Sequence, residues 1–123
     1  MTFELAKTFR FESAHRLPHV PEGHKCGRLH GHSFRVEIVV TGEADPQTGW
    51  VLDYGDISDV VRPVIDQLDH RYLNEIAGLE NPTSEVLCAW LWRRLADGLP
   101  GLSAIVLRET CTTACTYRGP HNT

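Results

Sequence analysis

The chain has 123 residues, which fits one domain over residues 1–123, and with 41% hydrophobic and 23% charged residues it has the composition of a folded globular protein. Its formal net charge of -4 offers no overall positive field for a nucleic-acid backbone, so DNA or RNA binding is disfavoured. The N-terminus lacks the basic start of a signal peptide, and no segment has membrane-spanning length. The four cysteines are too few and too unevenly placed for a disulfide framework. We therefore expect a cytoplasmic protein.

Two alternating segments near the N-terminus predict β-strands. In residues 7–15 the odd positions form an apolar row, and in residues 30–40 the even positions do so. This period of two is typical of strands with one buried face. His15, His30 and His32 extend these apolar rows, and the loop between the two strands is polar and cationic.

Apolar periodicity and turn residues predict five further elements: a short strand at 50–52, helices at 57–68 and from 83 to 98, and strands at 103–109 and 115–117. Thr83 is a candidate N-cap, and Pro63 falls on the polar side of the first helix, where a kink is easiest to accommodate. This order predicts an α+β fold with two helices on one face of an antiparallel sheet and a frayed end over residues 119–123.

The three histidines form a candidate metal site. His30 and His32 point to the same side of a strand, and His15 can supply a third nitrogen if the two strands pair. Zinc accepts three imidazoles, and such a site keeps a position for water or substrate. An isolated His-x-His is usually a surface or hydrogen-bonded pair, but these histidines continue apolar faces, where uncoordinated rings are costly to bury. A closed site with Cys26 as fourth ligand remains an alternative.

Five motifs, in this order along nearly the whole chain, resemble the 6-pyruvoyltetrahydropterin synthase family: FESAHRL at 11–17, CGRLHGH at 26–32, LDH at 68–70, NPTSE at 81–85 and ET at 109–110. Within the family, the three residues between the cysteine and His-Gly-His resemble the bacterial branch, the 6-carboxy-5,6,7,8-tetrahydropterin synthases of queuosine biosynthesis. The resemblance implies a tunnelling fold (T-fold), whose subunits assemble around a barrel as trimers and hexamers, with pockets at subunit contacts.

The resemblance also implies an activity, a zinc-dependent lyase reaction. The substrate would be 7,8-dihydroneopterin triphosphate, and the products 6-carboxytetrahydropterin, acetaldehyde and triphosphate. His15, His30 and His32 would hold Zn²⁺, which would coordinate substrate oxygens and stabilise an enolate. Cys26 would be the base, its thiolate favoured by the metal and by cationic neighbours such as Arg28.

Further site residues follow from the same resemblance. His70 would exchange a second proton, with Asp69 setting its tautomer. Glu109 would anchor the pterin through two parallel hydrogen bonds, and Arg28 and Thr110 would be further substrate-binding residues. Without the resemblance, His70 would be a cation at a helix C-terminus, and Asp69 and Glu109 ordinary surface charges.

Some alternatives stay open at this point. The cationic loop residues can hold the substrate triphosphate, or they can simply be solvated: His19, His24, Lys25 and Arg28. The activity can instead be that of a 6-pyruvoyltetrahydropterin synthase, which keeps the three-carbon side chain. A zinc or pterin-binding protein without turnover is the alternative from another class. The expected partners are a pterin substrate and copies of the same chain.

Overall fold

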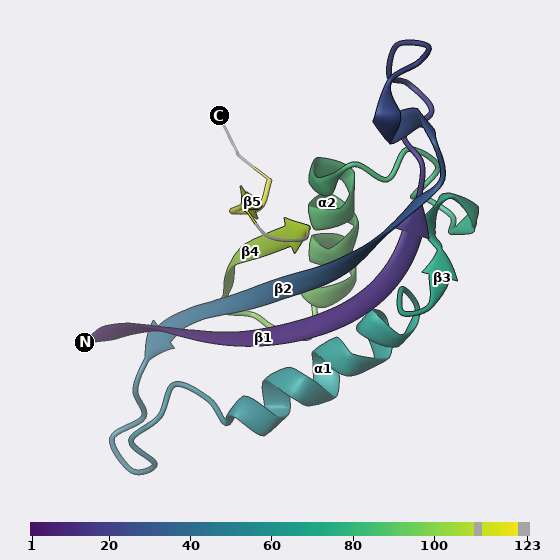
Figure 1. Ribbon diagram of the computed structural model, residues 1–123. Coiled ribbons are helices and arrows are strands. Elements are labelled where there is room, and N and C mark those ends of the chain that lie inside the picture. Colours follow the sequence, from purple (N-terminus) through teal and green to yellow (C-terminus); the bar gives the residue numbers. More distant parts are fainter. Residues whose placement is uncertain (110–111, 121–123) are drawn as a thin grey trace.

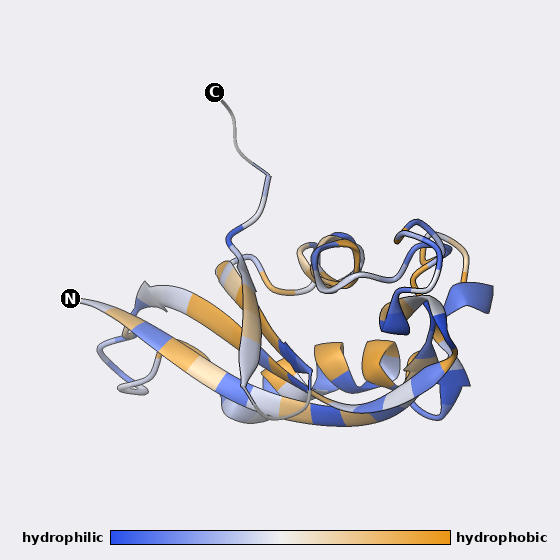
Figure 2. Ribbon diagram, turned by 45° about the horizontal axis from the view of Figure 1, so that its top comes forward, coloured by the Kyte–Doolittle hydropathy of each residue, from blue (hydrophilic) through white to orange (hydrophobic). Residues whose placement is uncertain are grey.

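Two long strands form the middle of the fold, and a computed structural model describes it for residues 1–109 and 112–120. Strand β1 (Thr2–His15) pairs antiparallel with β2 (His30–Glu43) along its whole length (Figure 1). Strands β4 (Leu102–Glu109) and β5 (Thr113–Tyr117) extend the sheet beyond β2, also antiparallel. Hydrophobic and hydrophilic residues alternate along the long strands, as predicted from their period of two (Figure 2).

The sheet is mixed rather than purely antiparallel, which corrects the prediction. A two-residue strand, β3 (Arg71–Tyr72), pairs in parallel with β1 at Ser13 and Ala14, giving the open order β3-β1-β2-β4-β5. So short a strand carries no periodic signal, which is why the sequence did not reveal it. Next to it lies a 3₁₀ turn, η2 (Leu73–Glu75).

The strand predicted at residues 50–52 is also wrong. Trp50 closes a turn instead, because its carbonyl accepts a hydrogen bond from the Asp45 amide at 2.9 Å, while the Gly49 amide donates to the Asp45 carbonyl at 2.8 Å. A short apolar run between turns is ambiguous, and here its backbone groups serve the turn.

The two predicted helices are present, and both pack on one face of the sheet. Helix α1 (Tyr54–Asp66) begins three residues earlier than predicted, because the Asp53 side chain accepts a hydrogen bond from the Gly55 amide at 2.8 Å. Pro63 lies inside this helix and is exposed, as predicted. Among the described residues, no helix has the length and apolar character needed to span a membrane.

Helix α2 (Ser84–Leu95) starts at its predicted cap, since the Thr83 hydroxyl accepts a hydrogen bond from the Val86 amide at 3.1 Å. This helix packs beside β4 and β5. Pro82, just before the helix, and Ser84, its first residue, therefore lie at the end of the sheet, where they contact His15 and Glu109. The end of the chain was predicted to fray over residues 119–123, but Gly119 is buried against the Trp92 ring. Residues 121–123 lie outside the described part of the chain.

A single apolar cluster joins the sheet to both helices within the described residues. The rings of Phe11 and Phe34 stack with centroids 4.7 Å apart, under the end of the sheet where the histidines lie. Trp90 is fully buried, and its Nε1 donates to the Ala77 carbonyl at 3.2 Å. A close-packed base of this kind fixes the direction of the side chains that continue the same strand faces.

Candidate metal centre

The strand register brings the three predicted histidines together. His15 lies directly opposite His30, and His32 follows two positions along on the same face of β2. One ring nitrogen from each histidine lies within 4.8 Å of the other two, and the ring centroids are 4.6 to 5.0 Å apart. Three imidazoles this close, at the end of an apolar face, form a group that can bind a metal ion.

Backbone carbonyls fix the orientation of two of these rings. The Nδ1 of His15 lies 3.0 Å from the Pro82 carbonyl oxygen, and the Nδ1 of His30 lies 2.7 Å from that of Arg28. A carbonyl only accepts, so each Nδ1 carries the proton and each Nε2 keeps its lone pair. Carbonyls in this position are typical partners of metal-binding histidines.

The Nε2 of His15 tests whether the group suits a metal. His15 is 2% exposed, and its Nε2 is the buried side-chain nitrogen or oxygen that lacks a hydrogen-bond partner among the described residues. An unsatisfied buried acceptor costs free energy, and few native structures retain one without a reason. A cation bound between the three rings would satisfy this nitrogen, so the residues present fit a metal.

Burial also favours the neutral form of two of the rings, those of His15 and His32. It lowers the pKa of His15, against the opposing effects of the Pro82 carbonyl and the Glu109 carboxylate. It lowers the pKa of His32 as well, again opposed by Glu109. A neutral imidazole is the form that binds a metal.

Cys26 lines the same cavity as the three histidines, and we call this cavity the metal cavity. The cavity has a volume of about 560 Å³, and its walls also include Lys25, Glu109 and Thr113. Cys26 lies in a short 3₁₀ turn, η1 (Lys25–Gly27), with its amide donating to the His24 ring at 3.1 Å and its carbonyl accepting from the Leu17 amide at 2.8 Å. Its sulfur does not join the histidine group, which argues against the closed site with Cys26 as a ligand.

Glu109 reaches this cavity from the end of β4. One carboxylate oxygen accepts a hydrogen bond from the Ser84 hydroxyl at 2.9 Å, and the other lies 3.9 Å from the Nε2 of His32. The predicted pterin anchor thus lies beside the histidine group. Sequence reasoning assigned no role to Ser84 or Pro82, although both lie in the NPTSE motif, and each contacts a site residue.

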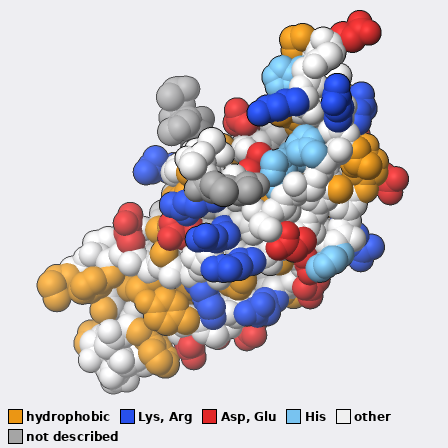
Figure 3. All heavy atoms as spheres, in the orientation of Figure 1, with side chains coloured by type: hydrophobic (Ala, Val, Ile, Leu, Met, Phe, Trp, Pro, Cys, Tyr) orange, Lys and Arg blue, Asp and Glu red, His pale blue; other side chains and the backbone are white. Residues whose placement is uncertain are grey.

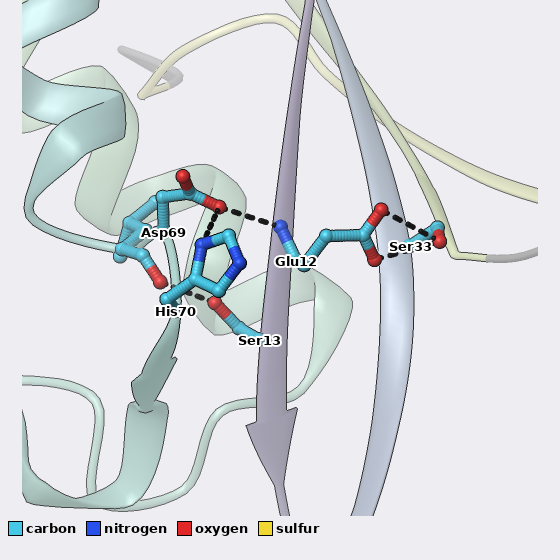
Figure 4. A network of polar contacts seen from close by, with 6 residues as sticks. Glu12, Ser13, Ser33, Asp69 and His70 are labelled. Atoms are coloured by element: carbon cyan, nitrogen blue, oxygen red, sulfur yellow. Dashed lines mark hydrogen bonds and ion pairs between the residues drawn. The ribbon is translucent and has the colours of Figure 1, made fainter.

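Asp69 and His70 form the predicted pair (Figure 4), but His70 lines a cavity other than the one that Cys26 lines. The Asp69 Oδ1 lies 3.0 Å from the His70 Nδ1 and accepts a hydrogen bond from the Glu12 amide at 2.9 Å, and this amide is the main reason why the pKa of Asp69 is lowered. His70 has a left-handed φ of 57°, and its amide donates to the Glu12 carbonyl. This second cavity has a volume of about 650 Å³, and among the described residues it shares only Gly31 and His32 with the metal cavity.

Arg28, a further predicted residue, does not line the metal cavity. Arg28 is exposed and lines a separate loop cavity of about 380 Å³ together with Arg16 and His24. Thr110 lies outside the described residues, as does Cys111. Of the cationic loop residues, Lys25 is the one that lines the metal cavity.

Comparison with known proteins identifies relatives over most of the chain. The profile of the family described as 6-pyruvoyl tetrahydropterin synthase matches residues 4–120. A protein from Synechocystis sp. named 6-carboxy-5,6,7,8-tetrahydropterin synthase is 45% identical over 120 residues, covering 93% of this chain and 92% of its own. A dihydroneopterin monophosphate aldolase from Pyrococcus furiosus is 44% identical over 73 residues, 59% of this chain and 60% of its own.

Solved structures confirm the expected T-fold. The structure of the Caenorhabditis elegans 6-pyruvoyl tetrahydropterin synthase is similar with a TM-score of 0.90 at 24% sequence identity, covering 98% of this chain and 97% of that one.

Proposed function

The chain belongs to the 6-pyruvoyl tetrahydropterin synthase family, and on this basis we propose that it is a zinc-dependent 6-carboxy-5,6,7,8-tetrahydropterin synthase. The reaction would convert 7,8-dihydroneopterin triphosphate to 6-carboxytetrahydropterin, acetaldehyde and triphosphate, as a step of queuosine biosynthesis. One observation carries the proposal: three histidines converge, with an unsatisfied buried nitrogen, in a cavity that also holds a thiol and a carboxylate.

His15, His30 and His32 would hold the zinc. When bound, zinc supplies a Lewis acid that polarises an oxygen of the substrate side chain. The carbonyls of Pro82 and Arg28 hold two of the rings in the tautomer this requires before any ion arrives. The apolar stack below the rings restricts their movement, so the ligand set is preorganised.

Cys26 would remove a proton from a carbon of the substrate side chain through its Sγ. It lines the cavity without belonging to the histidine group, so the sulfur is available for proton transfer. The neighbouring Lys25 adds a positive charge to the same cavity. The two backbone hydrogen bonds of Cys26 limit the movement of this base.

Glu109 would bind the pterin ring. Its carboxylate can accept two parallel hydrogen bonds from the ring amino group and the adjacent N–H, and the Ser84 hydroxyl orients it. This contact would place the substrate side chain near the histidines, because Glu109 itself lies beside His32.

Asp69 and His70 would serve as a second proton-transfer pair supplied by a neighbouring subunit. Within one chain His70 lines a different cavity from Cys26, and the His70 side chain is 79% exposed. Strand β1 also offers an edge to a neighbour, since in the described structure its outer side pairs only at Ser13 and Ala14. We therefore propose a homo-oligomer, a trimer or hexamer, with active sites between subunits.

A single assay tests the reaction. Zinc-loaded protein is incubated with 7,8-dihydroneopterin triphosphate, and the pterin product is identified by mass while acetaldehyde is measured separately. We expect 6-carboxytetrahydropterin with an equal amount of acetaldehyde. A 6-pyruvoyl product would assign the other activity of the family, and protein that holds zinc without turnover would contradict the enzymatic proposal. The monophosphate should be assayed in parallel, because one relative is named a dihydroneopterin monophosphate aldolase.

A further inference from the structure

Three arginines lie side by side across the middle of the sheet. Arg10 of β1 is the register partner of Arg35 of β2, and Arg35 is in turn the partner of Arg108 of β4. All three side chains are exposed, and they lie on the face away from the helices because the adjacent positions, such as Phe9 and Phe34, point into the core. Lys and Arg side chains gather over the middle of this face in Figure 3. We call these three residues the arginine row.

Within the described residues, no carboxylate neutralises the charges of the arginine row. Across residues 1–109 and 112–120, no carboxylate oxygen lies within 4.0 Å of any of the three guanidinium groups. The nearest acidic positions on the same face of these two strands are Glu12 and Glu37, and both carboxylate oxygens of Glu12 accept from the Ser33 hydroxyl, at 2.9 and 2.7 Å.

Like charges directly opposite each other on paired strands are destabilising. Here two such pairs occur in succession in a chain whose net charge is -4. A sequence that breaks a local rule of stability without a compensating contact within the chain often does so for function. An anion from outside would remove the repulsion.

We propose that the arginine row binds a linear polyphosphate chain. Neighbouring strands are about 4.8 Å apart, so the row extends over roughly 10 Å and suits an elongated anion with several charges better than a single carboxylate. Guanidinium groups bind phosphate oxygens in pairs and stay charged at any physiological pH. Arg108 faces Ala114 on its other side, so a small side chain leaves the approach to the row open there.

The site is distinct from the metal cavity, whose walls include none of the three arginines. The identity of the polyphosphate rests on the proposed function, in which the substrate carries a triphosphate and inorganic triphosphate is released. Either source presents the same chemistry to the row. The row would hold the tail of an arriving substrate or the released product.

Calorimetric titration with inorganic triphosphate tests the site directly. Wild-type protein is compared with Arg35→Gln, which removes the central charge, and with Arg93→Gln, which removes an exposed charge from α2 as a matched control. We expect Arg35→Gln to weaken binding at least about tenfold and Arg93→Gln to leave it unchanged. Because triphosphate chelates zinc, the titrations are done on zinc-loaded and on EDTA-treated protein, and the difference between variants should persist in both.

Thermal denaturation gives a second measurement. Inorganic triphosphate should raise the Tm of wild-type protein and of Arg93→Gln, but not that of Arg35→Gln. Equal Kd values for wild type and Arg35→Gln would overturn the proposal.

Kinetics then separates the two sources. A higher KM for the substrate in Arg35→Gln indicates the substrate tail, while weaker product inhibition by triphosphate at unchanged KM indicates the free product. If wild-type protein binds triphosphate through the row yet shows no turnover, the proposed function fails and the site stands.

Discussion

At the scale of single residues, the site depends on backbone contacts as much as on its side chains. Carbonyl oxygens fix the rings of His15 and His30, and a hydroxyl fixes Glu109. Among the described residues, Cys26 makes its hydrogen bonds through its amide and carbonyl, so its side chain can be changed without removing the bonds that hold the turn. Substitution of this thiol therefore tests the proposed proton transfer without changing any of the three histidines.

Replacing Cys26 by alanine should strongly reduce kcat while zinc is retained. Loss of a general base typically lowers the rate by about 10²–10⁴-fold, and we expect kcat to fall by this amount. Zinc content is measured by mass spectrometry of the purified variant, and Cys115→Ala serves as the control because Cys115 is a half-buried thiol on β5 that does not line the metal cavity. Loss of zinc together with activity would make Cys26 a ligand.

The described thiols should differ sharply in reactivity. Burial raises the pKa of Cys88, which is fully buried in the core, so this thiol should resist alkylation in the folded protein. Cys26 lines an open cavity and should react with iodoacetamide first. Mass spectrometry of peptides labelled before and after unfolding measures the order, and early labelling of Cys88 in the folded protein would contradict it.

At the scale of elements, sequence patterns predicted the long periodic strands and helices, but they missed the two-residue strand β3 and misassigned the short run at 50–52. The long alternations of β1 and β2 and the amphipathic helices are regular over ten or more residues, and all were found where expected within a few positions. The two-residue strand β3 is set by the contact between Arg71 and the end of β1, which is a tertiary event without a local signal. The run at 50–52 was misassigned because three apolar residues fit a strand and a turn equally well.

The same distinction applies to the site. The convergence of His15, His30 and His32 follows from period two and one assumption about pairing, so it was predictable. The separation of Asp69 and His70 from Cys26 was not, because it depends on where α1 returns the chain to the sheet. Nor could the sequence show that the residues around the start of α2 hold His15 and Glu109 in place.

The cap of α2 should therefore affect both stability and the metal site. Replacing Thr83 by alanine removes the hydrogen bond to the Val86 amide and should lower the free energy of unfolding by about 1 kcal/mol, while Thr83→Ser should restore most of it. Urea denaturation measures the loss. Because Pro82 and Ser84 flank this residue, zinc affinity should also fall in Thr83→Ala; unchanged stability and zinc affinity would show that the cap does not support the site.

At the scale of the whole molecule, the distribution of the predicted catalytic residues favours the proposed active site between subunits. Cys26 and the histidines line one cavity, and His70, the partner of Asp69, lines the other. Strand β1 also carries an edge that is unpaired along most of its length in the described structure. A site completed by a neighbour would unite these groups, and exposed His70 would then be buried at a subunit contact.

Mixing two inactive variants tests this arrangement. Cys26→Ala and His70→Ala should each lack activity alone, and subunits of the two should regain up to about a quarter of wild-type activity when unfolded and refolded together, because random assembly pairs an intact Cys26 with an intact His70 at that frequency. Each variant refolded alone is the control. Mixed oligomers without activity would show that a site uses residues of one chain only.

The shared register of β1 and β2 has a consequence for how this chain can change in length. Because successive residues of a strand point to opposite sides, deleting one position between Phe11 and His15 would turn His15 toward the face that carries the arginine row. Insertions of two residues would keep the face but move the ring about 7 Å along the strand. We therefore expect gaps among related sequences to fall in the loop between the strands, where the chain can lengthen without altering either face.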